Sequence, residues 1–484
     1  CRTIKCTTRQ RNANTDGNVM KIKTLQLSNF RAFKHFKCQF NTRMNVLVGL
    51  NGFGKTSVLD AIAIGYGQFV GGFETSKDKG ILNSDIRLAK HLLGREGESI
   101  NVQNATANRI RMERQFPVEI QVTTYQETQT SLPSEWTRTR NTLKGRTTQV
   151  KELKAVAKEL QKSVQNNEKV TLPLLSYYGT GRLWKEKRLT EKKKNPAVNI
   201  NTRLDGYSDC LDPESTYSAF AQWLRVETIA DYERTMQLIE EAGLEGAIVQ
   251  GSTFRSKLLK AIEKAVNTVL EPSGWHNIRY SAVAEEVVAT HKDQGDVPVS
   301  YLSDGVRNMI GMIADIAYRA IRLNPHLAED AVSKTSGIVL IDEVDMHLHP
   351  QWQQLVLQNL SEAFPTLQFI VTTHSPQVLS TVKNDEILIL PNIGAGEFEA
   401  LHPVGETYGK PSNYVLTQTL NVDARPPLSQ VKLFDEYMRL INSGLGKSNE
   451  AREKRSELEE KLGKGHEDLA HADRVLKRKE LLGE

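Results

Sequence analysis

One eight-residue segment, residues 49–56 (GLNGFGKT), restricts the fold of this chain more than any other feature. It matches the pattern GxxxxGK(S/T), and roughly 0.02 such matches are expected by chance at average residue usage in a chain of 484 residues. An apolar run, Met44–Val48, precedes the segment, and a helical pattern over residues 56–64 follows it. A glycine loop between a buried strand and a helix binds nucleotide phosphates, so we expect an α/β nucleotide-binding domain rather than a simple glycine turn.

The chemistry of this segment follows from its residue types. Glycines let the backbone fold closely around phosphate oxygens, and the loop N–H groups and the helix N-terminus attract anions. Lys55 is expected to reach the β- and γ-phosphates, and the hydroxyl of Thr56 is expected to hold Mg²⁺. The expected nucleotide ligands of this segment are Asn51, Gly52, Gly54, Lys55, Thr56 and Ser57.

A second segment, residues 337–343 (GIVLIDE), is an apolar strand that ends in two adjacent carboxylates. Asp342 can support Mg²⁺, and Glu343 can orient or deprotonate a water molecule, which is what phosphoryl transfer to water requires. A strand that ends in Asp-Glu is a weak signal alone. Together with the glycine loop, it predicts that the chain binds and hydrolyses ATP.

Two further segments narrow the class of nucleotide-binding protein. Residues 301–307 (YLSDGVR) lie immediately before a predicted helix, and residues 368–375 (QFIVTTHS) form a buried strand that ends near a histidine. Taken alone, Ser303 is also explained as a helix N-cap, because Ser and Asp commonly begin helices. His374 taken alone is also explained as a loop histidine with an ordinary hydrogen bond.

Strand-like and helical segments alternate along most of the chain, which favours an α/β core with a parallel sheet. Antiparallel strand pairs are expected beside it. The expected strands are residues 21–27, 36–40, 44–48, 116–125, 135–140, 172–178, 278–288, 297–302, 337–341, 367–372 and 385–390. The expected helices are residues 56–64, 150–170, 214–270 with breaks at Gly243 and Gly251, 304–323, 351–364, 430–441, 448–462 and 466–481.

Changes in composition suggest where the domains begin and end. Residues 1–19 are polar and basic, without a starting Met or an apolar core, and are expected to be a disordered extension or an artefact of the reading frame, with Met20 as the natural start. The expected divisions are 1–19 (extension), 20–200 (head lobe with the glycine loop), 201–295 (mainly helical insertion), 296–395 (head lobe with the other three motifs) and 396–484 (linker and helical interaction module). A plain stabilising bundle is the alternative for the last helices.

The composition excludes several classes of protein. No run approaches 18 apolar residues, so no transmembrane helix is expected. The 63 Lys and Arg residues against 58 Asp and Glu residues leave a net charge of +5, which permits but does not require a local nucleic-acid contact. The four cysteines form no CxxC pair, which argues against a disulfide scaffold or a zinc site and favours a cytoplasmic location.

In this order, the four motifs resemble those of the ABC-type ATPases of the SMC/RecF class, over most of residues 20–390. The resemblance implies an α/β, ABC-ATPase-like two-lobed head, with a parallel P-loop sheet, an antiparallel lobe, a helical insertion and a C-terminal helical module. It implies that Ser303 and Gly305 meet the γ-phosphate of ATP bound to the opposite copy, and that His374 senses that phosphate. Residues 29–31 (NFR) resemble the motif in which Arg31 approaches the nucleotide. Two copies would then enclose two ATP molecules.

The chain also departs from that class. ABC proteins place a glutamine at the junction of the lobes, where this chain has residues 177–182 (YYGTGR), and whether Thr180 or Arg182 replaces it is open. The interval between Thr56 and Ser303 holds only moderate helices, and since a 20-residue helix spans about 30 Å, no long coiled-coil arm is expected. After residue 390 the acidic metal motif of OLD-type nucleases is missing from the sequence, so no nuclease is expected in this chain.

The chain also resembles PtuA, the ATPase component of Septu-type anti-phage systems, and its retron-linked relatives. This resemblance lies in residues 177–184 (YYGTGRLW), in residues 341–353 (IDEVDMHLHPQWQ) and in the C-terminal tail. The resemblance implies an oligomeric ATPase that partners a separate HNH nuclease. Residues 182–194 hold seven basic and two acidic residues, a local net charge of +5, with Trp184 among them. This segment favours contact with DNA or a small nucleic acid, and a solvated loop is the alternative.

Three functional hypotheses follow. The first is a defence ATPase that hydrolyses Mg-ATP through Glu343 and thereby regulates a separate nuclease. The second is a RecF-like repair ATPase that binds DNA by itself. The third is a nucleotide-sensing scaffold with little turnover.

Overall fold

The computed structural model divides the chain into two compact units, Cys1–Val415 and Leu416–Glu484. It describes residues 20–92, 110–126, 132–181, 202–213, 218–249, 257–391, 397–423 and 425–482. The expectations for residues 1–19 and for the basic segment, residues 182–194, lie outside these stretches.

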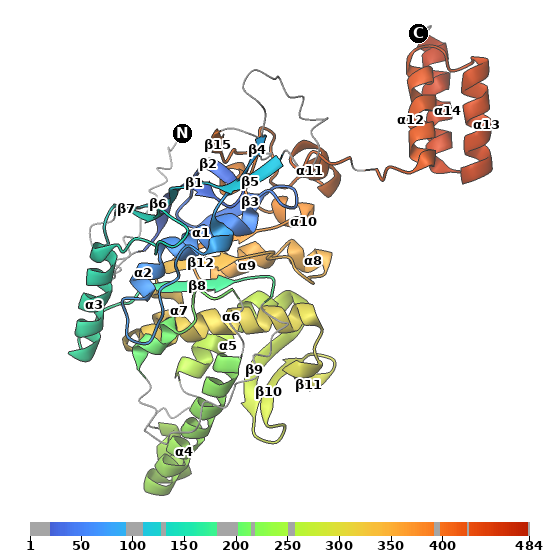
Figure 1. The fold of residues 1–484 in the computed structure, drawn as a ribbon. Helices are drawn as coiled ribbons and strands as arrows, with labels where there is room; N and C mark the ends of the chain where they lie inside the picture. Colours follow the sequence, from blue (N-terminus) through green and yellow to red (C-terminus); the bar gives the residue numbers. More distant parts are fainter. Residues whose placement is uncertain are drawn as a thin grey trace, which may run out of the picture. The chain divides into compact units, whose positions relative to one another are not determined.

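A five-stranded parallel sheet, in the order β14-β3-β13-β12-β8, forms the core of the first unit. Figure 1 labels its strands β3, β12 and β8. Every residue of β3, β8, β12 and β13 is buried, which explains the continuous apolar runs in the sequence. Ile341 at the end of β12 lies in register between Tyr178 and Val371. The strands are β3 (Met44–Val48), β8 (Leu174–Tyr178), β12 (Gly337–Ile341), β13 (Leu367–Thr372) and β14 (Ile387–Ile389).

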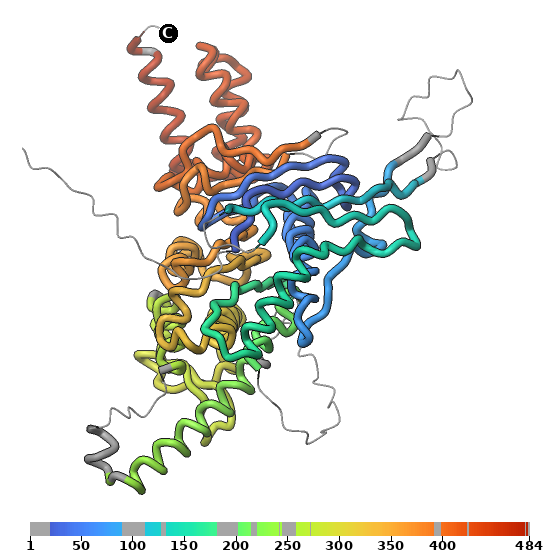
Figure 2. The backbone as a smooth tube through the Cα atoms, turned by 90° about the vertical axis from the view of Figure 1, so that its left-hand side faces the viewer, coloured from blue at the N-terminus to red at the C-terminus, as the bar shows by residue number. Residues whose placement is uncertain are grey.

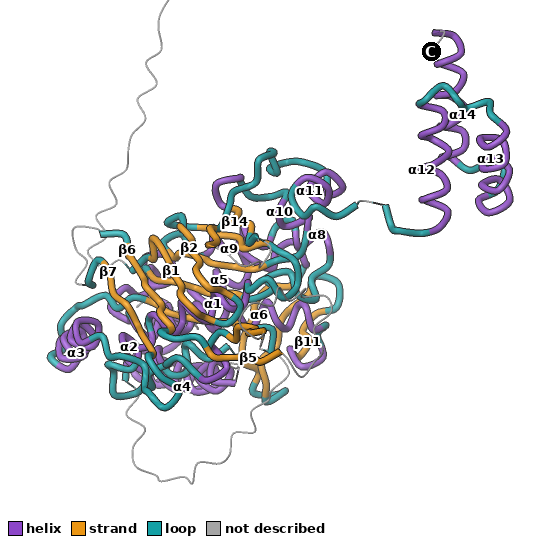
Figure 3. The backbone as a smooth tube through the Cα atoms, turned by 45° about the horizontal axis from the view of Figure 1, so that its top comes forward, coloured by secondary structure: helices purple, strands orange, loops and turns teal. Residues whose placement is uncertain are grey.

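A second sheet, in the order β15-β2-β1-β6-β7, is antiparallel except for the pair β15–β2. Figures 2 and 3 show its longer strands running side by side. The side chain of Gln368 on β13 joins the two sheets, because it donates to the carbonyls of Ile22 and Asn41 at 2.8 and 2.6 Å and accepts from the N–H of Ile22 at 2.8 Å. The strands are β1 (Ile22–Phe30), β2 (Phe33–Gln39), β6 (Val118–Thr124), β7 (Glu135–Arg140) and β15 (Glu397–Glu399).

Helix α1 (Lys55–Gly65) follows β3 and contacts both sheets, through β13 on one side and through β6 and β7 on the other. Gly65 allows a close approach, since a Cβ there would lie 2.8 Å from a methyl group of Val122. Two further helices, α2 (Gly67–Val70) and α3 (Lys151–Gln165), pack against one another. The structure thus surrounds α1 with strands, and nine of its eleven residues are buried.

Helix α6 (Asp304–Leu323) packs against β8 and against α5 (Lys257–Leu270). Helix α4 (Ser218–Val249) extends away from the sheets in Figure 2 and is interrupted at Gly243, whose φ of 71° is outside the helical region. The break expected at Gly243 is therefore confirmed. A three-stranded sheet of β9 (Trp275–Ser281), β10 (Glu286–His291) and β11 (Gly295–Pro298) lies beside these helices.

Several expected elements differ in the structure. The strand expected over residues 278–288 is wrong, because the chain turns at residues 282–285 and returns as β10. The helix expected over residues 351–364 is divided into α8 (Pro350–Gln353) and α9 (Val356–Ala363). Two segments outside the expected elements pair as β4 (Leu88–Leu92) and β5 (Ile110–Arg114). The remaining helices of this unit are α7 (Ala331–Lys334), α10 (Pro376–Leu379) and α11 (Ser412–Gln418), the last of which crosses into the second unit.

The second unit is a three-helix bundle of α12 (Ser429–Asn442), α13 (Asn449–Leu462) and α14 (Glu467–Leu482). Its core consists of Phe434, Tyr437, Ile441, Ala451, Leu458, Leu469 and Ala472. All three helices match the expected ones within one residue at each end. In neither unit does any helix of the described stretches have the length and apolar character needed to cross a membrane.

Candidate functional site

The glycine loop leaves the end of β3 and leads directly into α1, as the sequence predicts. Gly52 and Gly54 have φ values of 83° and 89°, in the left-handed region that glycine adopts without strain. At Gly54 the space is also limited, since a Cβ would lie 2.4 Å from the ring of Phe33. Asn51 is exposed within the loop, and Ser57 is buried in the first turn of α1.

The side chain of Lys55 folds back over this loop. Its Nζ donates to the carbonyl oxygens of Gly49 and Leu50 at 2.8 and 3.2 Å. Burial lowers the pKa of Lys55 below its usual value, although the carboxylates of Asp342 and Glu343 act in the opposite direction. The ammonium group therefore lies at the centre of the loop and within the field of both predicted carboxylates.

The loop and the carboxylate strand meet at Thr56 and Asp342. The hydroxyl of Thr56 donates to Oδ2 of Asp342 at 2.8 Å, and the hydroxyl of Thr372 donates to Oδ1 at 2.6 Å. The N–H of Glu343 donates to the Thr372 hydroxyl at 2.7 Å, and Glu343 has a φ of 50°. Thr372, which the sequence reasoning missed, thus orients both carboxylate residues.

His374 lies in the loop after β13 and is exposed. Partial desolvation by the atoms around the ring, followed by the charge of Lys55, lowers the pKa of His374 below the usual 6.5, against the opposite effect of Glu343, Asp345 and Asp342. These electrostatic interactions place His374 near the site. Within the described stretches His374 makes no hydrogen bond. The alternative explanation, a loop histidine with an ordinary hydrogen bond, is therefore not observed there.

Arg31 is held by two carboxylates. Its Nη1 lies 2.8 Å from Oδ2 of Asp60 on α1, and its Nη2 and Nε lie 2.8 and 2.9 Å from Oδ1 of Asp85. Lys79 lies 3.4 Å from the other oxygen of Asp60 and over the ring of Tyr177. Asp60 is another residue that the sequence reasoning missed, and it connects Arg31 to the helix that follows the glycine loop.

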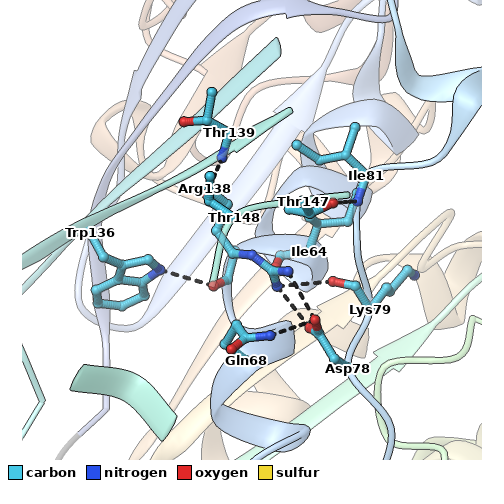
Figure 4. Close-up of polar contacts among 11 residues, drawn as sticks. Ile64, Gln68, Asp78, Lys79, Ile81, Trp136, Arg138, Thr139, Thr147 and Thr148 are labelled. Carbon is cyan, nitrogen blue, oxygen red and sulfur yellow. Dashed lines mark hydrogen bonds and ion pairs between the residues drawn. The ribbon is translucent and has the colours of Figure 1, made fainter. Parts of the chain in front are cut away.

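Arg138 on β7 binds the end of α1 and the segment that carries Asp78 and Lys79. Its guanidinium is fully buried and donates to the Ile64 carbonyl at 2.9 Å, to the Lys79 carbonyl at 3.1 Å, and to both oxygens of Asp78 at 2.8 and 3.0 Å (Figure 4). Trp136 donates to the carbonyl of Gly65, which follows Ile64. One strand, β7, therefore binds the last carbonyls of α1 and the segment that carries Lys79.

The predicted residues Ser303 and Gly305 form a separate group at the start of α6. Ser303 occupies the N-cap position, but its exposed hydroxyl makes no capping hydrogen bond. Gly305 lies against the loop after β12, since a Cβ there would be 2.2 Å from the carbonyl oxygen of His347. Among the described residues, neither Ser303 nor Gly305 makes a hydrogen bond or ion pair with the glycine loop. Thr180 is exposed after β8, and Arg182 lies outside the described stretches.

The residues of the glycine loop, together with Asp342, fit Mg-ATP. The left-handed glycines open the loop, Lys55 is available to exchange carbonyl partners for phosphate oxygens, and Thr56 already contacts a carboxylate oxygen. Across the described residues there is no group of three or more His, Cys, Asp or Glu side chains that could hold a metal ion alone.

Comparison with known proteins identifies two matching family models and a relative that is similar over most of this chain. The family model described as "AAA domain" matches residues 24–267, and the one described as "AAA domain, putative AbiEii toxin, Type IV TA system" matches residues 249–380. The chain is 28% identical to the "Retron Ec83 probable ATPase" of Escherichia coli over 499 aligned positions, which cover 94% of this chain and 86% of the relative.

Two further similarities are more limited. The chain is 32% identical to the "Septu protein PtuA" of Bacillus thuringiensis over 121 residues, which are 24% of this chain and 30% of the relative. A solved SMC head bound to the C-winged helix domain of ScpA is 14% identical, with a TM-score of 0.44, and the match covers 79% of this chain and 98% of that chain.

Proposed function

Since this chain belongs to the AAA domain family of ATPases, we propose that it hydrolyses ATP between two copies of itself and so controls a separate nuclease in bacterial defence against phage. The observation that carries the ATPase part is the hydrogen bond between Thr56 and Asp342. It brings together the two segments that hold phosphate and Mg²⁺ in such enzymes.

The roles of the residues follow from their positions. When Mg-ATP is bound, it supplies the phosphoanhydride bond that is broken and the cation that neutralises phosphate charge. Thr56 and Asp342 would hold the Mg²⁺, and Lys55 would contact the phosphates. Glu343, held at its N–H by Thr372, would orient the attacking water and accept its proton, and His374 would remain neutral near pH 7 because its pKa is lowered.

The arrangement of Ser303 and Gly305 supports completion of the site by a second copy. Among the described residues, neither makes a hydrogen bond or ion pair with the glycine loop of its own chain, and the Ser303 hydroxyl is exposed without a capping bond. A second copy would present these groups to nucleotide held by the first. Arg31 would approach the nucleotide if its ion pairs with Asp60 and Asp85 rearrange. ATP would then shift the population towards the closed pair, because only that pair contacts it completely.

The defence role is supported by the relatives. The retron ATPase and the Septu protein PtuA are similar to this chain, the former over most of its length. We propose an HNH nuclease as the partner, with closure of the ATPase heads gating it. The charged three-helix bundle of the second unit is the proposed interaction module, and DNA or a small nucleic acid is a further proposed ligand.

Mixing two inactive variants tests this function. Lys55→Ala is expected to lose ATP binding, and Ser303→Arg is expected to bind ATP without hydrolysing it. Mixed together, they should recover hydrolysis, because one intact composite site forms between the two variants. Absence of any recovery, with both variants folded, contradicts the shared site.

The gating part needs its own measurement. Glu343→Gln is expected to accumulate as an ATP-bound oligomer and to alter cleavage by the co-expressed nuclease. A chain that restricts phage without any nuclease would contradict the gating of a separate nuclease. Tight, salt-dependent DNA binding in ATP without any partner would instead support a repair protein of the RecF type. Intact bound ATP in single-turnover assays, with no effect of Glu343→Gln, would indicate a sensing scaffold.

A further inference from the structure

A buried polar network joins the end of β8 to helix α6. The hydroxyl of Tyr178 donates to Oδ2 of Asp315 on α6 at 2.7 Å, and Nε of Arg319 donates to the same oxygen at 2.7 Å. Arg319 also donates to the carbonyls of Gly206 and Ser208 at 2.9 and 3.0 Å. The exposed fractions of Tyr178, Asp315 and Arg319 are 3%, 3% and 4%, so water does not weaken these bonds.

Tyr178 also contacts the candidate catalytic strand. Its carbonyl oxygen accepts the N–H of Asp342 at 2.8 Å, and it is paired in register with Ile341. The same helix that receives its hydroxyl begins at Asp304, directly after Ser303. Tyr178 is therefore hydrogen-bonded to the backbone of Asp342, the proposed Mg²⁺ ligand. It is also hydrogen-bonded to Asp315 on α6, the helix that begins directly after Ser303.

The form of the network favours a positional role over a purely stabilising one. The second carboxylate oxygen of Asp315 is buried and has no hydrogen-bond partner in the described part of the chain. A buried ion pair with an unsatisfied oxygen contributes little net stability, because its desolvation offsets its attraction. Burial and then the Asp315 carboxylate raise the pKa of Tyr178 well above its usual value, so the phenol remains a hydrogen-bond donor.

We propose that Tyr178 is a positioning residue, whose hydroxyl bond to Asp315 holds α6 relative to Asp342 so that Ser303 can meet nucleotide bound by the opposite copy. This inference rests on the proposed shared site. It assigns no contact with substrate to Tyr178. Loss of the bond should leave the glycine loop intact and change only the placement of α6.

Tyr178→Phe tests the inference, with Tyr207→Phe as a matched control. The Tyr207 hydroxyl is also buried and donates one 2.7 Å bond, to the carbonyl of Pro173, but it makes no hydrogen bond to Asp342 or Asp315. Both variants should lower the Tm by a similar few degrees. Tyr178→Phe should lower kcat about tenfold and leave KM and the affinity for a fluorescent ATP analogue unchanged, whereas Tyr207→Phe should keep the wild-type kcat.

Equal kcat values for the two variants would overturn the inference. A second measurement adds Tyr178→Phe to Glu343→Gln and compares ATP-dependent association by analytical ultracentrifugation. The double variant is expected to associate about tenfold more weakly than Glu343→Gln. If Glu343→Gln associates and the second change has no effect, the positioning role alone is wrong. If Glu343→Gln remains a monomer in ATP, the shared site and this inference both fail.

Discussion

The hydroxyl of Thr56 donates a 2.8 Å hydrogen bond to Oδ2 of Asp342, a residue 286 positions later in the chain. The bond exists because β3 and β12 flank β13 in one parallel sheet, so that their carboxyl ends open at the same edge. Strand order thus brings the hydroxyl and the carboxylate together before any ligand is bound.

Replacement of Thr56 by Ala should remove one Mg²⁺ ligand and one partner of Asp342. We expect the apparent affinity for Mg²⁺ in ATP hydrolysis to fall about 10- to 100-fold. The measurement is a Mg²⁺ titration of the initial rate at saturating ATP. Thr56→Ser retains the hydroxyl and should stay within a few-fold of the wild type, and equal losses in the two variants would contradict the assignment.

Replacement of Gly54 by Ala should damage the fold as well as the site. The residue has a φ of 89°, and the new methyl group would lie 2.4 Å from the ring of Phe33, so both strain and a clash are introduced. We expect a loss of about 2–3 kcal/mol in the free energy of unfolding. Gly52→Ala has a similar φ of 83° and no neighbour within 4 Å. It should cost only about 1 kcal/mol in the same denaturant titration.

Replacement of Asp78 by Ala should destabilise the chain strongly, because it leaves the fully buried guanidinium of Arg138 without its carboxylate partner. We expect a loss of about 3 kcal/mol, measured by chemical denaturation. The control is Asp330→Ala, which removes an exposed partner of Lys334. That change should cost less than about 1 kcal/mol, and a similar loss for both variants would show that the Arg138 pair is not specially important.

The acid limb of ATP hydrolysis should depend on His374. Desolvation and Lys55 lower its pKa, so the midpoint of proton uptake in the folded protein lies below pH 6.5. Activity that needs the neutral ring therefore declines as the pH falls through that midpoint. The unfolded chain binds the proton more readily, so the contribution of this group to stability also falls in that direction. Profiles of kcat between pH 5 and 8 should lose this decline in His374→Gln, and an unchanged profile would exclude the role.

Much of the core could be predicted because burial on both faces produces apolar runs with clear ends. The expected bounds of Met44–Val48, Gly337–Ile341 and Leu367–Thr372 are those of β3, β12 and β13. The hairpin of β9 and β10 was missed, since residues 278–288 read as one β-rich run. Its turn includes Glu285 with a φ of 55°, a left-handed conformation that a Glu in the sequence does not predict.

The site was predictable only as far as its motifs are local in sequence. Lys55, Thr56 and Asp342 follow from residue patterns, and the structure brings them together. The partners of Arg31 do not, because Asp60 and Asp85 lie in ordinary helical and turn positions and acquire their role through packing. The bond between Tyr178 and Asp315 spans 137 positions and carries no signature in either segment.

One side-chain amide, that of Gln368, joins β13 to the second sheet. The side chain of Gln368 is hydrogen-bonded to the N–H and the carbonyl of Ile22 and to the carbonyl of Asn41. Three hydrogen bonds thus connect β13 to the neighbouring antiparallel sheet. A hinge between the two sheets would have to break all three bonds in a buried place. The second sheet and β13 should therefore move together as one piece during the nucleotide cycle.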